Sequence, residues 1–468
     1  MPFVNQQSNQ HRLNDRLVVA TDEARDACEQ MRASERTLRP DHCGPGPFVV
    51  TDRQPYSPQR IRGIIQMNVL GSGLVMLRWV YAIVIGLCVC AGARANVFDT
   101  AAEDLEVSLV TYGPGAIYWE RFGHDAIRLR DRSSGQSVDF NYGVFDFEEG
   151  DFILNFARGY MSYMIDVEHS EADQQDYIDA GRSVLEQRLR LSAAEAAKLR
   201  SFLLWNLRPE NERYDYDYLI NNCATRVRDA LNSAVGGAIQ PALIARPAQM
   251  TYRQQIDRLM AAQPWMMLGM DLGLGPSADR PLNEWQESFL PMELARNLRT
   301  VRLSDGQPLV VDEHEIAPNR LPPPDPGPPN LALSLGLAGL AFAAVMLGSR
   351  VRYPRLAFSL AALYLVLAGA VGILLLALWT LTTHHAAWGN ANLLIFNPVA
   401  FLILMALWRA RRLARTLLAG QIGALLLGLG LFVFSSATQR NLPWLLFGIP
   451  VWLAVAAELG PQWLRMRP

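Results

Sequence analysis

The part of the chain after Asn330 constrains the fold most strongly, because five long apolar stretches follow one another there. They cover about residues 331–348, 356–381, 393–408, 417–434 and 442–459. Each comes close to the length of helix that crosses a hydrocarbon layer of about 30 Å at about 1.5 Å per residue. The sequence therefore predicts an all-α membrane domain of five transmembrane helices over residues 331–460.

The arginines around these stretches predict how the membrane domain is oriented. They gather between the first and second stretches, between the third and fourth, and after the fifth: Arg350, Arg352, Arg355, Arg409, Arg411, Arg412, Arg415, Arg465 and Arg467. The two remaining loops contain only Arg440. Because arginine and lysine are enriched in cytoplasmic loops, the arginine-rich side is expected to be cytoplasmic. The residues before the first stretch then lie outside the cytoplasm.

Length and composition exclude several other classes. The chain has 468 residues, which exceeds one ordinary domain of roughly 100–200 residues. Half of the residues are hydrophobic and the formal charge is −2, so neither a disordered chain nor a nucleic-acid partner is expected. We expect a soluble domain over residues 96–321. A proline-rich linker over 322–330 (PPPDPGPPN) then joins it to the membrane domain.

The residues before the soluble domain resemble an export signal. Arg78 precedes a short apolar run, and Ala93-Arg94-Ala95 has the small-residue pattern of a cleavage site, so residues 76–95 are predicted to be a signal peptide. Residues 1–75 are polar and lack periodicity, which indicates a disordered extension or a translation start at Met76 or Met67. The alternative is an uncleaved first helix with a cytoplasmic tail.

Cys223 is the only one of the five cysteines in the exported region. It lies in NNCATRVRDALNSAVGG, where the apolar residues have helical spacing and Asn222 is a favourable N-cap. A cysteine in the first turn of a helix is exposed to free N–H groups, which can lower a thiol pKa from about 8.5 to roughly 3.5–7.5. We therefore expect Cys223 to be a nucleophile, and a small buried hydrophobic residue is the alternative.

His124 is the best candidate for the base that such a thiol requires. HDAIRLR and SVDFNYGVF are predicted to be two strands around a turn, with His124 on the face opposite Ile127. Folding this hairpin places residue 124 roughly opposite 141–143, so Asn141 is the expected partner of the imidazole and Asp139 the alternative. His169 and His314 are expected to be solvated surface residues.

These segments resemble a known family. SLVTYGPGAIYWERFGHDAIRLR, FNYGVFDF and YDYDYLINNCATRVRD are similar to the periplasmic domain of Lnb-type bacterial lipoprotein N-acyltransferases, which also carry a C-terminal membrane domain. The resemblance covers nearly all of residues 96–468. It implies a protein of the bacterial inner membrane with an α+β papain-like (permuted NlpC-like) periplasmic domain. In that domain Cys223 would be the nucleophile, His124 the base and Asn141 the third catalytic residue.

The resemblance also implies the reaction. An acyl chain would pass from a membrane phospholipid to Cys223, and then to the α-amine of the diacylglyceryl-modified N-terminal cysteine of a lipoprotein. No metal or cofactor is expected. The tetrahedral oxyanion would be held by the Cys223 N–H and by Asn222 or a tyrosine, with Tyr216, Tyr214 and Tyr218 as candidates. Arg226 would contact a phosphate, or pair with Asp229.

The outer loop THHAAWGNANLLIFNP between the second and third stretches is a candidate headgroup site. It has no acid or arginine, but it contains His384, His385 and Asn392. Ordinary interfacial residues are the alternative. Two other functions fit the same cysteine and histidine: a cell-wall amidase or peptidase, and a non-catalytic lipid-handling or lipoprotein-handling protein.

Overall fold

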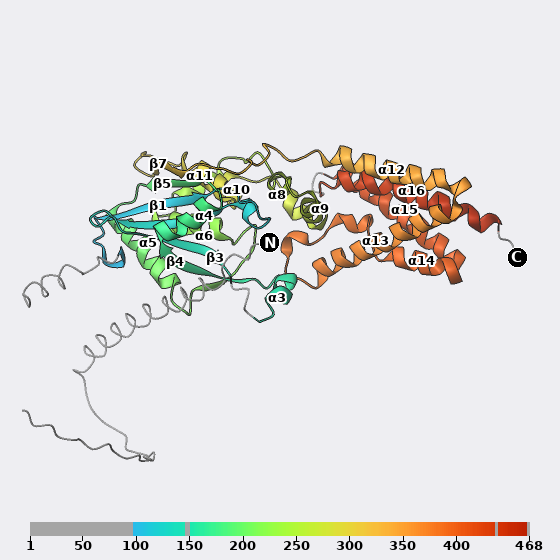
Figure 1. The fold of residues 1–468 in the computed structure, drawn as a ribbon, viewed down its shortest axis with the longest axis horizontal. Coiled ribbons are helices and arrows are strands. Elements are labelled where there is room, and N and C mark those ends of the chain that lie inside the picture. Colours follow the sequence, from blue (N-terminus) through green and yellow to red (C-terminus); the bar gives the residue numbers. More distant parts are fainter. Residues whose placement is uncertain (1–96, 146–149, 436–438, 466–468) are drawn as a thin grey trace, which may run out of the picture. The chain divides into compact units, whose positions relative to one another are not determined.

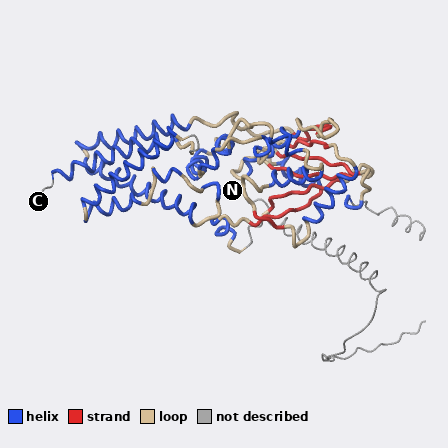
Figure 2. Tube along the Cα trace, turned by 180° about the vertical axis from the view of Figure 1, so that it is seen from behind, coloured by secondary structure: helices blue, strands red, loops and turns tan. Residues whose placement is uncertain are grey.

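The computed structural model describes residues 97–145, 150–435 and 439–465, with side chains described as far as residue 459. The predicted extension (1–75) and signal peptide (76–95) lie outside these residues. The chain has a domain of mixed strands and helices followed by a domain of helices, and Figure 2 distinguishes the two by colour. The predicted fold class, an α+β domain followed by five apolar helices, is confirmed.

One antiparallel sheet organises the first domain. Its strands are β1 (Leu105–Tyr112), β2 (His124–Asp131), β3 (Ser137–Val144), β4 (Ser162–His169), β5 (Val184–Leu189), β6 (Arg213–Asp215) and β7 (Val310–Ala317). They lie in the order β6-β4-β3-β2-β1-β5-β7, and every neighbouring pair is antiparallel (Figure 1). The strands that carry the predicted histidine and its partner, β2 and β3, are therefore central.

The hairpin of β2 and β3 forms because its turn is stabilised locally. The carboxylate of Asp131 accepts hydrogen bonds from the backbone N–H of Ser133 (2.9 Å) and from the hydroxyl of Ser134 (2.7 Å). Such side-chain bonds to the following residues favour a turn. The resulting register pairs Ala126 with Asn141, and continuing it places residue 124 opposite residue 143.

The helices cover both faces of the sheet. The helices of this domain are α3 (Phe152–Arg158), α4 (Ser170–Asp179), α5 (Ala193–Asn206), α6 (Cys223–Ala234), α7 (Ile239–Ile244), α8 (Tyr252–Met260), α9 (Pro264–Gly273), α10 (Glu284–Glu287) and α11 (Pro291–Leu298), and those that pack on the sheet include α4, α5 and α6. On one face, Ile127 and Phe140 form the main core with Leu203 of α5 and Leu231 of α6. On the other face, Tyr112 and Ala126 pack against α4, which fits the alternation of side chains along a strand.

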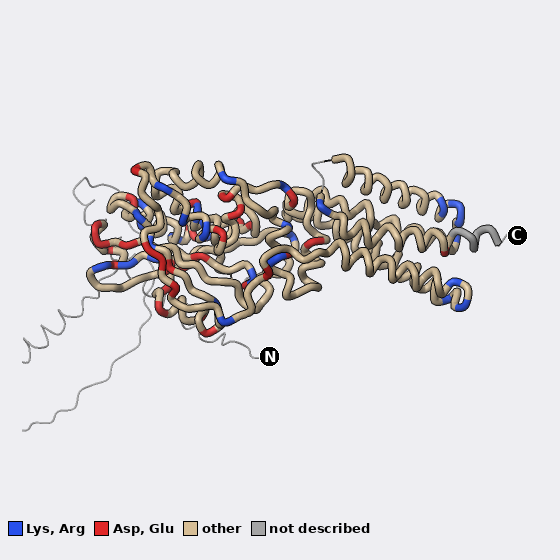
Figure 3. Tube along the Cα trace, turned by 90° about the horizontal axis from the view of Figure 1, so that it is seen from above, with Lys and Arg blue, Asp and Glu red and all other residues tan. Residues whose placement is uncertain are grey.

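The second domain contains the five predicted membrane-spanning segments. Its helices are α12 (Leu331–Arg352), α13 (Pro354–Thr380), α14 (Val399–Arg409), α15 (Arg411–Phe434) and α16 (Leu442–Arg465). By length and apolar composition, five segments among the described residues can cross a membrane, the third being Ala391–Arg409. Figure 3 shows the arginine-rich loops at the end of this bundle that faces away from the first domain, as the charge pattern predicted.

The third span is not one continuous helix, in contrast to the prediction for 393–408. It begins with the short turn η5 (Ala391–Leu394), and α14 starts only at Val399. Pro398 explains the break, because proline disfavours helical backbone at the residue before it. Gln421 of α15 compensates: it accepts a hydrogen bond from the amide of Asn397 (2.6 Å) and donates one to the backbone of η5 (3.1 Å). Non-helical backbone at membrane depth requires such internal partners.

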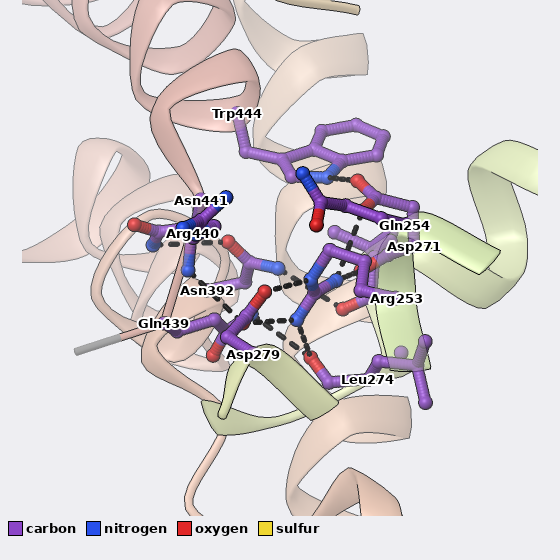
Figure 4. Close-up of polar contacts among 12 residues, drawn as sticks. Arg253, Gln254, Asp271, Leu274, Asp279, Asn392, Gln439, Arg440, Asn441 and Trp444 are labelled. Atoms are coloured by element: carbon purple, nitrogen blue, oxygen red, sulfur yellow. Dashed lines mark hydrogen bonds and ion pairs between the residues drawn. The ribbon is translucent and has the colours of Figure 1, made fainter. Parts of the chain in front are cut away.

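A buried charge cluster joins the two domains (Figure 4). Arg253 of α8 pairs with Asp271 of α9 (2.9 Å) and with Asp279 of the short helix η3, Pro276–Asp279 (2.9 Å). Asp271 also accepts a hydrogen bond from the indole of Trp444 in α16 (2.7 Å), and Asp279 accepts one from the backbone N–H of Arg440 (3.0 Å). These three residues of the first domain therefore bind the outer side of the helix bundle.

Amide side chains of the outer loops complete this junction. Asn390 and Asn392 donate to the backbone carbonyl of Leu272 (2.8 and 3.0 Å), and Gln439 donates to that of Leu274 (2.9 Å). Leu272 itself packs against the core of the bundle. The last turn of α9 is thus capped by the membrane domain, which satisfies carbonyls that have no partner within a helix.

Candidate active site

Cys223 is the first residue of α6, as predicted, and Asn222 is its N-cap. The Asn222 side chain accepts a hydrogen bond from the backbone N–H of Thr225 (2.9 Å) and donates to the carbonyls of Tyr218 (3.1 Å) and Phe289 (2.9 Å). Both ends of this buried amide are therefore engaged in holding the helix start. The prediction that Asn222 donates to an oxyanion is not supported by this geometry.

Gly143 makes room for the thiol at the end of β3. Its φ is +92°, a conformation that favours glycine, and a side chain there would place its Cβ 3.4 Å from the Cβ of Cys223 and 3.8 Å from the ring of Tyr216. Half-buried Cys223, the first residue of α6, thus lies against the end of β3. Of the predicted tyrosines, Tyr216 borders this position, and Tyr214 is also close enough to interact electrostatically with the thiol.

The environment of the sulfur differs from the prediction of a lowered pKa. Burial, and to a smaller extent the nearby carboxyl group of Asp125, raise the pKa of the Cys223 thiol to about 12. Backbone hydrogen bonds from Asp125, Ala224 and Cys223 itself offset part of this effect. Free N–H groups at the helix start do reach the sulfur, but desolvation is the larger effect. Cys223 is therefore a neutral thiol at physiological pH.

His124 begins β2 and is held by Asn141, the predicted partner. Its Nε2 lies 2.9 Å from Oδ1 of Asn141, and the Asn141 amide in turn hydrogen-bonds Asp173 of α4. Because the carboxylate takes the amide N–H, the Asn141 oxygen faces the ring, so Nε2 carries the proton and Nδ1 is free to accept one. Burial lowers the pKa of His124 to about 4, so the ring is neutral at physiological pH.

Asp139, the alternative partner, is engaged elsewhere. Arg128 binds both of its oxygens at 2.7 Å, and the hydroxyl of Ser170 donates to it at 2.6 Å. Tyr112 links this pair to the histidine: its hydroxyl lies within hydrogen-bond distance of Asp139 (3.2 Å) and Asp173 (2.6 Å), and its ring stacks on His124. Asp139 therefore belongs to a buried polar network, and this network holds Tyr112 against the ring of His124.

Tyr177 and Arg182 connect the two halves of the site, and sequence reasoning did not identify either. Tyr177 stacks on Tyr112 (3.7 Å between centroids) and lies 6.0 Å from the ring of His124, while the guanidinium of Arg182 covers its outer face. A Cys223 thiolate would interact electrostatically with both Tyr177 and Arg182. The thiol and the imidazole therefore both lie near Tyr177.

Some polar atoms of this region are buried without a hydrogen-bond partner among the described residues. They include Nη2 of Arg182 and Oδ2 of Asp125, and the hydroxyl of Tyr214 is a third such atom near the thiol. Within that part of the chain, the sulfur of Cys223 and the ring of His124 also make no hydrogen bond to each other. Catalytic contacts of this kind often tighten only when substrate binds. No sequence motif marks Arg182, whereas Asp125 is adjacent to His124 in the chain.

Arg226, His169 and His314 are the other predicted residues of this domain. The guanidinium of Arg226 covers the ring of Tyr214 at 4.2 Å, and Asp229 pairs with Arg228 (2.8 Å) instead of Arg226. The cation–π contact explains this difference, because Arg226 and Tyr214 approach through tertiary packing. His169 and His314 are exposed, as expected.

The outer-loop candidates divide into two groups. Asn392 is fully buried, donates to Leu272 and accepts from Asn441 (3.2 Å), so its amide serves the junction between the domains and is not exposed to a lipid headgroup. His384 is half-buried and donates from Nε2 to the carbonyl of Phe156 (3.0 Å). His385 is exposed and lies against the ring of Trp388.

Comparison with known families agrees with the sequence resemblance. A model described as the Lnb N-terminal periplasmic domain matches residues 98–258, and a model described as the Lnb transmembrane domain matches residues 328–458. No curated protein and no solved structure gives a match. The two family matches together cover more than half of the chain and follow each other in the predicted order. The chain belongs to the Lnb family, and it is a multi-pass membrane protein of this lipoprotein-processing family with a periplasmic domain.

Proposed function

We propose that this protein is a membrane-bound thiol acyltransferase that moves an acyl chain from a phospholipid to the α-amine of a lipoprotein's diacylglyceryl-modified cysteine. Cys223 is the nucleophile, His124 the general base and Asn141 the residue that orients the imidazole. The observation that carries the proposal is a neutral His124 held by Asn141 in the same cluster as a helix-starting thiol. The bacterial inner membrane, with the catalytic domain in the periplasm, is the proposed location.

In the first half-reaction, the sulfur of Cys223 attacks the ester carbonyl of the phospholipid. Nδ1 of His124 takes the thiol proton as the C–S bond forms, and the imidazolium gives it to the leaving alkoxide, which departs as a lysophospholipid. Because burial raises the thiol pKa and lowers the imidazole pKa, proton transfer accompanies attack rather than preceding it. The product is a thioester on Cys223.

In the second half-reaction, the lipoprotein amine attacks the thioester carbonyl. His124 accepts a proton from the amine, the C–S bond breaks, and the thiol is regenerated as the amide forms. Both tetrahedral intermediates carry a negative oxygen. The backbone N–H groups of Cys223 and Asp125, which already lie at the sulfur, are well located to stabilise it, and Tyr216 is a further candidate donor.

Cys223→Ala in a strain that depends on this protein for N-acylation tests the proposal. Mass spectrometry of lipoprotein N-termini should show loss of the N-acyl group, and Ser201→Ala on α5, an exposed hydroxyl remote from the site, should leave it intact. Immunoblotting of membranes must show equal amounts of both variants. Unchanged lipoproteins with altered muropeptides would indicate a cell-wall amidase instead, and no change in either would refute catalysis by Cys223.

A further inference from the structure

The short helix α3 exposes an apolar surface that the described part of the protein does not cover. Its sequence is FILNFAR, and none of its seven residues is buried. Ile153 is 83% exposed, Leu154 46% and Phe156 49%. An isolated helix of this length is not stable in water, and its apolar side chains gain nothing there. A neighbouring apolar phase is therefore needed to account for its composition.

The position of α3 identifies that phase. The backbone N–H of Thr383 donates to the carbonyl of Arg158 (2.8 Å), and His384 donates to that of Phe156 (3.0 Å), so α3 is bound to the loop that directly follows α13 (Figure 1). A side chain at Gly159 would lie 2.5 Å from the Thr383 hydroxyl, which shows how closely the two segments approach.

The helix α13 places this contact at the membrane surface. Its 27 residues extend over about 40 Å, more than the about 30 Å of hydrocarbon, so its outer turn reaches the interfacial layer. Trp379 and Leu381 at this end are exposed, as lipid-facing residues would be. Because α3 is bound to the loop that follows this end, its exposed apolar side chains are expected at the same interfacial layer, and exposed Arg158 can extend its charge toward phosphate groups.

A row of aromatic rings leads from α3 to the thiol. Phe152 stacks on Phe145 (5.7 Å between centroids), Phe145 contacts Tyr163 (5.0 Å), and Tyr163 stacks on Tyr216 (4.2 Å). Tyr216 lies beside Cys223 across Gly143. Apolar contact is therefore continuous between the exposed helix and the reacting sulfur.

We propose that α3 is an interfacial helix whose Ile153, Leu154 and Phe156 lie in the outer leaflet, where they receive a phospholipid acyl chain and pass it along the aromatic row to Cys223. The occupant of this surface is the bilayer itself. The membrane contact stands independently of the reaction. The passage of an acyl chain rests on the proposed function.

Membrane contact is tested with a nitroxide label at Ile153→Cys in the full chain with its five native cysteines replaced by alanine. The control is Ile244→Cys on α7, which is 48% exposed in the same domain. In phosphatidylethanolamine–phosphatidylglycerol vesicles, the label at 153 should collide with oxygen more than with a water-soluble nickel complex, and the label at 244 should do the reverse. Equal behaviour of both labels would refute the proposal. Dipolar broadening that unlabelled protein removes would assign the surface to a second copy and also refute it.

Passage of the acyl chain is tested with Ile153→Ser combined with Leu154→Ser. We expect the apparent KM for vesicle phospholipid to rise about tenfold, because two apolar side chains leave the lipid. Turnover of a water-soluble short-chain ester should stay unchanged, as should both activities of Ile244→Ser. Equal losses with both substrates would refute the passage. Membrane insertion of the label at 153, together with no acyl transfer by the wild-type protein, would instead refute the proposed function and leave the membrane contact intact.

Discussion

Asn141→Ala is the most informative single change in the proposed site. Asn141 accepts the Nε2–H of His124 at 2.9 Å, so it stabilises the charged imidazolium more than the neutral ring. It also selects the tautomer in which Nδ1 carries no proton. We expect thioester formation to slow while binding of the donor lipid changes little. The reason is that the lost interaction is stronger in the transition state than in the ground state.

The size of the effect follows from the hydrogen bond. A bond to a neutral group contributes about 0.5–1.5 kcal/mol and one to a charged group about 1.5–3 kcal/mol, so the differential loss is about 1–1.5 kcal/mol. At 1.36 kcal/mol for each factor of ten, this slows the chemical step roughly 5- to 12-fold. Free choice of tautomer lowers the rate further, and we expect roughly 5- to 30-fold in total.

The assay is single-turnover formation of the Cys223 thioester from vesicle phospholipid, measured by intact-protein mass spectrometry. Asn206→Ala in α5 is the matched control, because Asn206 is equally buried (5% against 6% exposed) and loses one amide hydrogen bond at 2.9 Å. Asn141→Asp adds a second readout: a carboxylate beside the ring raises the pKa of His124, so the acid limb of the rate profile should move to higher pH.

Two results would refute this reasoning. The first is a rate for Asn141→Ala within about twofold of wild type, since it lies below the loss derived from the hydrogen bond. The second is an equal loss in Asn206→Ala, which would mean that general destabilisation explains the effect. An Asn141→Asp profile with an unmoved acid limb would show that His124 is not the group that titrates.

Three further predictions address the rest of the molecule. Arg253→Met leaves two buried carboxylates unpaired and should lower the free energy of unfolding by about 3–5 kcal/mol, measured as thermal unfolding in detergent. Arg299→Met, which breaks an exposed pair, should cost less than about 1 kcal/mol, and equal shifts would contradict the assignment. Because burial raises the pKa of Cys223 to about 12, its alkylation by iodoacetamide should speed up about tenfold per pH unit from about pH 7 to 9, and a plateau below about pH 8 would mean that the thiolate is already formed. Arg182→Met removes a cation that interacts electrostatically with the Cys223 thiolate and should slow thioester formation about tenfold, so an unchanged single-turnover rate would exclude this role.

Much of the site's chemistry could be predicted from local patterns. Helical spacing after Asn222 located Cys223 at a helix start, and the alternation in HDAIRLR placed His124 on one face of a strand. The turn chemistry of the hairpin brought Asn141 into reach of the ring. These features depend on residues close in sequence, so their geometry follows from backbone preferences.

The sequence alone also determined the membrane domain, because the length of an apolar stretch and the placement of arginines are properties of the chain rather than of its packing. Tertiary structure decided what the pattern could not express. Burial reversed the expected pKa shift of Cys223. Tyr177 of α4 and Arg182, which follows this helix, are distant in sequence from the predicted residues but lie beside them in the fold. Asn392 is part of the junction between the domains. Desolvation and long-range contact depend on which surfaces meet, and that is specified only when the whole chain is folded.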